Sequence, residues 1–80
     1  MPTVFRWNGF RFYFFSNEAS PREPVHIHVE RDGGEAKLWL FPEVHVADCV
    51  GFSRSTQADL VRIVEARRQE IERAWNEHFR

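Results

Sequence analysis

Apolar and polar residues alternate strictly along the segment 25–30. Its apolar positions are Val25, Ile27 and Val29, and its polar positions are His26, His28 and Glu30. Successive side chains of a β-strand point to opposite faces, so this pattern predicts a half-buried strand. The two histidines and the glutamate are expected to share one face of it.

The dipeptide Asn8-Gly9 separates two further strand-like segments, 3–7 and 10–15. Asn-Gly tolerates the positive φ angles of a type I′ turn and is a strong hairpin signal. A two-residue turn would pair Trp7 with Phe10, Arg6 with Arg11, Phe5 with Phe12, and Val4 with Tyr13. The facing arginines either point into water or pair with glutamates, or they hold an anion.

A second hairpin is predicted around Asp32-Gly33-Gly34, which precedes the alternating segment 35–40. A turn at Gly33-Gly34 sets Glu30 opposite Lys37, whereas a turn at Asp32-Gly33 sets Glu30 opposite Glu35. We favour the first register because it opposes unlike charges. Both registers put the same residues on the core side, because they differ by two positions; these residues are Ala36, Leu38 and Leu40.

The segment 16–24 is expected to be a surface loop, and 43–49 either a short edge strand or an irregular connection. Ser53 or Thr56 is the expected N-cap of a helix. From Leu60 onward, apolar residues recur at helical spacing and charged residues occupy the other positions. This pattern predicts a long amphipathic helix.

Together these elements predict a single α+β domain over 1–80, with two antiparallel β-hairpins in one sheet of four to five strands. The long C-terminal helix should cover one face of the sheet. We call the other face the open face, and we expect it to form the binding surface. Its predicted members are Arg6, Arg11, Tyr13, His26, His28, Glu30, Lys37 and Trp39.

Composition narrows the possible functions. A net charge of −1 provides no global basic field for non-specific binding of nucleic acid. The single cysteine, Cys49, excludes an internal disulfide and fits a reducing compartment. No apolar stretch is long enough to span a bilayer, and the N-terminus lacks the charged segment followed by an apolar segment that is typical of a secretion signal. We therefore expect a cytoplasmic protein that needs no cofactor.

These motifs resemble a family of uncharacterised small bacterial proteins, the domain of unknown function 4160 family. The resemblance runs nearly end to end and rests on the segments 1–3, 9–14, 16–17, 24–30, 35–40, 51–53 and 74–79. It implies a small cytoplasmic prokaryotic protein, commonly encoded beside a second small gene in an arrangement similar to toxin-antitoxin modules. The resemblance implies a protein partner. It brings no established catalytic residues with it.

The open face permits several functions. His26 and His28 are candidate metal ligands, although two histidines cannot complete a site alone. A third or fourth ligand would have to come from elsewhere; His45 is the only other histidine nearby in the sequence, and His78 is expected on the helix. The same two histidines are the candidate acid-base pair of a metal-independent ribonuclease toxin, for which RNA would be the substrate.

A third possibility is a protein-binding surface, since Trp, Tyr and Arg are enriched at interface hot spots. We favour this function, with the cognate partner forming a toxin-antitoxin-like pair. An inhibitor of a defence system would expose a similar surface. In the remaining interpretation, His26 and His28 are ordinary cross-strand neighbours of Trp39 and Lys37 on a solvated face.

Overall fold

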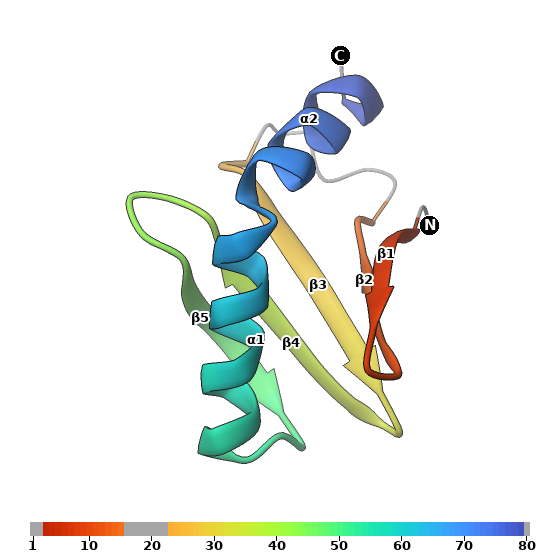
Figure 1. Cartoon of the computed structure of the whole chain (residues 1–80), viewed down its shortest axis with the longest axis vertical. Coiled ribbons are helices and arrows are strands. Elements are labelled where there is room, and N and C mark those ends of the chain that lie inside the picture. Colours follow the sequence, from red (N-terminus) through yellow and green to blue (C-terminus); the bar gives the residue numbers. More distant parts are fainter. Residues whose placement is uncertain (1–2, 16–22, 80) are drawn as a thin grey trace.

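The computed structural model describes residues 3–15 and 23–79, which form a five-stranded antiparallel sheet followed by two helices (Figure 1). The strands lie side by side in chain order: β1 Thr3–Trp7, β2 Phe10–Tyr13, β3 His26–Arg31, β4 Gly34–Trp39 and β5 His45–Val50. The helices α1 Arg54–Ala66 and α2 Arg68–His78 lie on one face of the sheet. The predicted α+β class is confirmed.

The first hairpin turns at Asn8 and Gly9, whose φ angles are 53° and 81°. Both values are positive, as a type I′ turn requires. Three predicted pairs are confirmed, namely Trp7 with Phe10, Arg6 with Arg11, and Phe5 with Phe12. The predicted pairing of Val4 with Tyr13 is wrong, because a bulge at Val4 brings Thr3 opposite Tyr13.

The second hairpin turns at Asp32 and Gly33, with φ angles of 49° and 83°. The favoured turn at Gly33-Gly34 is therefore wrong, and Glu30 lies opposite Glu35. By the same register, His28 lies opposite Lys37 and His26 opposite Trp39.

Two contacts explain this register. The ring of Phe52 packs against Gly34, the first residue of β4, where a Cβ would clash with it, so this position requires a glycine. Glu30 also has a cationic partner on its other side, because Arg11 forms an ion pair with it at 3.3 Å. The like-charged pair of Glu30 and Glu35 is thereby tolerated. The core residues predicted for this strand, Ala36, Leu38 and Leu40, are buried.

The segment 43–49 contains most of β5, which forms one edge of the sheet. Lys37 pairs with Asp48 whereas Leu38 pairs with Val46, so β5 bulges at Ala47. The Asp48 carboxylate accepts a hydrogen bond from the backbone N–H of Cys49 at 3.0 Å. The bulge and this local hydrogen bond both make the edge a poorer template for another strand.

The helical segment begins at Ser53, whose side-chain oxygen accepts a hydrogen bond from the Thr56 N–H at 3.1 Å. Ser53 is thus the N-cap, and Thr56 lies inside α1. The predicted helix is divided at Arg67, which has φ −109° and ψ 19° and separates α1 from α2. α2 continues toward the end of the sheet at which β3 begins (Figure 1). The helical residues that face the core are Leu60, Val64, Ile71 and Trp75.

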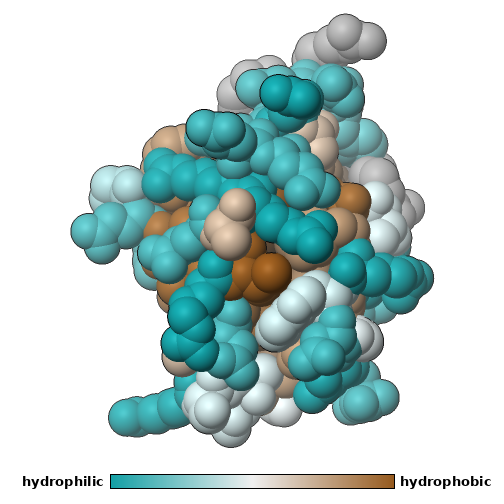
Figure 2. Space-filling view, viewed as in Figure 1, coloured by the Kyte–Doolittle hydropathy of each residue, from teal (hydrophilic) through white to brown (hydrophobic). Residues whose placement is uncertain are grey.

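The core lies between the helices and one face of the sheet, and the first hairpin supplies most of its aromatic rings. Phe5 stacks on Phe12 with ring centroids 4.3 Å apart, and Phe14 meets Trp75 edge to face at 5.2 Å. Each such buried ring contributes about 1.5 to 3 kcal/mol through removal of apolar surface from water. The outer surface of the helices is mainly hydrophilic (Figure 2).

Residues 16–22 of the predicted loop lie outside the described residues, whereas its last two residues are described. No helix in the described part of the chain is long and apolar enough to cross a membrane. Cys49 is a free thiol.

Candidate functional site

The sheet register arranges the open face in rows that run across the strands. One row is Arg6, Arg11, Glu30 and Glu35, from β1 to β4. The next row is Thr3, Tyr13, His28, Lys37 and Asp48, and a third begins with His26 and Trp39. We call the first of these the charged row. The register therefore places all eight predicted binding residues on one face.

Arg11 lies at the centre of the charged row. Its Nε donates to the Thr3 hydroxyl at 2.8 Å, and its Nη1 lies 3.3 Å from a Glu30 carboxylate oxygen. Its guanidinium lies 4.3 Å from the centroid of the Tyr13 ring. Of the interpretations open for the facing arginines, pairing with a glutamate therefore applies to Arg11.

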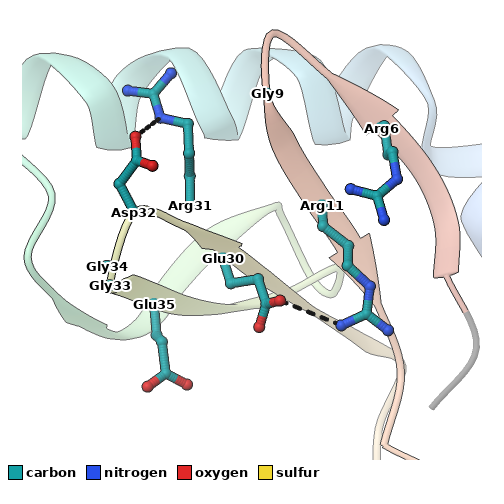
Figure 3. Close-up of a pocket in the computed structure, with 9 residues that line it drawn as sticks. All are labelled: Arg6, Gly9, Arg11, Glu30, Arg31, Asp32, Gly33, Gly34 and Glu35. Carbon is teal, nitrogen blue, oxygen red and sulfur yellow. Dashed lines mark hydrogen bonds and ion pairs between the residues drawn. The ribbon is translucent and has the colours of Figure 1, made fainter.

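A shallow depression of about 380 Å³ lies at the turn end of the charged row (Figure 3). Arg11, Glu30 and Glu35 project away from the helices, whereas Arg31 points toward them. Arg31 lies over the Phe10 ring at 3.9 Å and donates to the Asn8 carbonyl at 3.1 Å. Arg31 thus ties the two hairpin turns together, and the charged row lines the depression.

Tyr13 belongs to the open face by register, but only 2% of it is exposed. The prediction that Tyr13 is displayed to solvent is wrong, because the Arg11 guanidinium and the rings of His28 and Phe15 pack around it. Burial raises the pKa of the Tyr13 hydroxyl above its usual 10.0, and the charge of nearby Glu30 raises it further.

His26 is fully buried, so its predicted display on the open face is also wrong. The centroid of its ring lies 5.2 Å from that of Trp39 and 5.0 Å from that of Trp75 of α2. Its Nδ1 lies 2.9 Å from the Pro24 carbonyl oxygen. His26 is buried because β2 is short. The pairing of β2 with β3 ends at Tyr13, so β2 does not flank His26, and Trp75 of α2 packs against this end of β3 instead.

His28 is half-buried beneath the Phe15 ring, with centroids 4.2 Å apart. A second depression of about 240 Å³ adjoins this pair, and we call it the aromatic depression. It is lined by Phe15, His28, Glu35, Ala36, Lys37, Asp48 and Val50. Val50 is 67% exposed, which makes it one of the two large hydrophobic residues exposed in the described chain.

Lys37 connects the aromatic depression with Trp39. Its Nζ lies 4.3 Å from the Trp39 ring centroid and 3.2 Å from a Glu23 carboxylate oxygen. A cation held over an indole in this way gains about 0.5 to 1 kcal/mol at an exposed site. Lys37 and Trp39 therefore form one unit of the surface.

The histidines are too dispersed to form a metal centre together. His45 has its Nδ1 2.7 Å from the Glu43 carbonyl oxygen, and His78 is exposed on α2, where its ring stacks on that of the buried Phe14. Among residues 3–15 and 23–79, no group of three or more His, Cys, Asp or Glu side chains is placed to hold a metal ion.

Several residues of this surface were not among the predicted binding residues. Glu35 alternates with Lys37 and could have been found from the strand pattern. Asp48 and Val50 required the register of β5, which the bulge at Ala47 shifts. Phe15 is the second residue after the end of β2, and only the folded chain places its ring on His28.

One comparison with known proteins gave a match. A model of the family described as "Domain of unknown function (DUF4160)" matches residues 9–76. Searches of curated proteins and of solved structures found no match.

Proposed function

Because this chain belongs to the DUF4160 family, whose description assigns no activity, we propose from its geometry that it is a binding module for a cognate protein partner. The open face of the sheet is the binding surface. The module works in the cytoplasm as one component of a toxin-antitoxin-like pair. That last part rests on the gene arrangement that the resemblance implies.

The observation that carries the proposal is the aromatic depression. Its apolar members are Phe15 and the exposed Val50, and its polar members include Lys37, Asp48 and Glu35. Protein interfaces combine an apolar centre with a polar rim in this way. The half-buried Trp39 beside Lys37 adds the residue type most enriched at hot spots.

The surroundings of the histidines support binding over catalysis. A His-dependent ribonuclease needs an acid and a base that both reach the substrate. His26 is fully buried and packed between two tryptophans, so only His28 of that pair has accessible surface.

The test is a native capture experiment with the product of the neighbouring gene, recording intact mass and the ratio of absorbance at 260 and 280 nm. We expect a stoichiometric protein complex without nucleic acid. Val50→Asp should weaken it about tenfold, since hot-spot changes cost more than about 1 kcal/mol. Ala58→Asp is the matched control, because Ala58 is exposed on α1 and should leave the affinity unchanged.

Other outcomes would contradict the proposal. If Val50→Asp and the wild type bound the partner with equal affinity, the aromatic depression would not be part of the interface. RNA that is trimmed during incubation, with loss of trimming in His28→Gln, would favour the ribonuclease. Capture of a component of a host defence system in place of the neighbour would favour the inhibitor.

A further inference from the structure

The charges of the charged row are segregated by strand. Its two arginines lie on β1 and β2, and its two glutamates lie on β3 and β4 (Figure 3). Neighbouring strands are about 4.8 Å apart, so the row extends over about 14 Å with a positive half and a negative half. The row is therefore a dipole that lies across the sheet.

The inner and outer members of the row differ in their partners. Arg11 and Glu30 form an ion pair with each other at 3.3 Å. Arg6 and Glu35 are exposed, and neither has an ion pair with another residue that the structure describes. The outer charges of both signs are therefore available to an approaching molecule.

We propose that the charged row pairs with the charged row of a second copy of this chain. The two open faces would meet about a two-fold axis that runs parallel to the strands between β2 and β3. Such an axis keeps each row opposite itself and exchanges its two halves. Arg6 of each copy then lies opposite Glu35 of the other, and Arg11 opposite Glu30.

The shape and charge of the molecule are compatible with this pairing. Packed sheets lie about 10 Å apart, a gap that an arginine and a glutamate can bridge together. The depression of about 380 Å³ is lined by both halves of the row, and its half beside Glu30 and Glu35 can receive the Arg6 guanidinium of the second copy. The net charge of −1 causes little long-range repulsion between two copies.

This inference goes beyond the proposed function, because it assigns a second occupant to part of the same face and requires no cognate partner. The dimer is weak and sensitive to salt, since exposed ion pairs contribute little and are screened. A cognate protein that covers the open face displaces the second copy.

The experiment is analytical ultracentrifugation of the purified chain at low and high ionic strength. We expect a monomer-dimer equilibrium that weakens with salt. Arg6→Glu and Glu35→Arg should each raise the dimer dissociation constant about tenfold, because each creates two like-charged contacts across the axis. Arg73→Glu, an exposed change on α2, is the control and should have no effect.

Two ways of combining these substitutions make the test specific for a second copy. The double variant Arg6→Glu/Glu35→Arg should dimerise as the wild type does, because both reversed charges are again complementary across the axis. An equimolar mixture of the two single variants should form a heterodimer. Far-UV circular dichroism of each variant verifies that it is folded.

A chain that stays monomeric up to about 1 mM at low salt would overturn the proposal. So would a dimer that neither single reversal weakens, or a double variant that fails to recover. These results leave the capture experiment unaffected, because that experiment measures binding of a different protein and its key variant is at Val50.

Discussion

At the scale of single residues, the open face includes side chains that solvent does not reach. His26 is enclosed by Trp39, His28 and Trp75, although its strand position matches that of the half-buried His28. Its Nδ1 lies 2.9 Å from the Pro24 carbonyl oxygen, so the ring also holds the backbone in place just before β3 begins. We therefore expect its role to be structural.

His26→Ala should lower the free energy of unfolding by about 2 to 4 kcal/mol, because it leaves a cavity and removes a buried hydrogen-bonding group. His45→Ala is the matched control, since His45 is exposed at the start of β5, and should change stability by at most about 0.5 kcal/mol. Urea denaturation measures both. Equal stabilities of the two variants would contradict a structural role for His26.

Tyr13 is the only tyrosine of the chain, so tyrosinate absorbance reports on it alone. Burial and the charge of Glu30 raise its pKa above 10.0 in the folded protein. The folded state therefore holds the proton more tightly. The resulting stability is fully present below pH 10.0 and is lost as the pH rises through the raised pKa.

We therefore expect the wild type to lose stability above pH 10.0 more steeply than Tyr13→Phe, which has no ionisable hydroxyl. The measurement is the urea midpoint as a function of pH, together with a tyrosinate titration of the folded protein. A titration midpoint at or below 10.0 would contradict the prediction.

At the scale of elements, the boundaries are set by local hydrogen bonds. Ser53 caps α1 by accepting from the Thr56 N–H, and the Gln57 side-chain amide donates to the Phe52 carbonyl at 3.1 Å. Asp48 similarly accepts the N–H of Cys49 on the β5 edge. Short-range side-chain hydrogen bonds thus define where the helix begins and limit pairing at the sheet edge.

Ser53→Ala should destabilise the domain by about 1 kcal/mol, the usual cost of losing an N-cap. Ser55→Ala is the control, because Ser55 is exposed in the first turn of α1, where alanine favours the helix. Thermal unfolding followed by circular dichroism gives both values. A Ser55→Ala variant that loses as much stability as Ser53→Ala would contradict the cap.

At the scale of the whole molecule, one core joins every element. The cluster includes Phe5 of β1, Ile27 of β3, Leu38 of β4, Leu60 of α1 and Trp75 of α2, and Val46 of β5 packs against it. Because each element either buries residues in this cluster or packs against it, no part of the described chain has a separate core. We expect residues 1–80 to behave as a single domain.

The corresponding prediction is a single cooperative unfolding transition, with coincident midpoints by tryptophan fluorescence and far-UV circular dichroism. Leu60→Ala should lower both midpoints together, with a loss of about 2 to 5 kcal/mol for a fully buried leucine. Two separate transitions would contradict the single domain.

Local patterns in the sequence were sufficient to predict much of the fold. The alternation around His28, the Asn8-Gly9 turn and the Ser53 cap are short-range signals, since each depends on residues close together in the chain. They indicated the first four strands, most of the pairing in the first hairpin, and Ser53 as one of two candidate N-caps, whereas β5 was left open. They also placed all eight predicted binding residues on the same face.

Only the tertiary structure decided which of those residues solvent can reach. The Asp32-Gly33 register depends on Phe52 packing against Gly34, and the burial of His26 depends on Trp75; both contacts join residues far apart in the sequence. The aromatic depression likewise combines Phe15 with Val50. A side chain's exposure depends on what packs against it from distant segments, and periodicity along one strand carries no information about those neighbours.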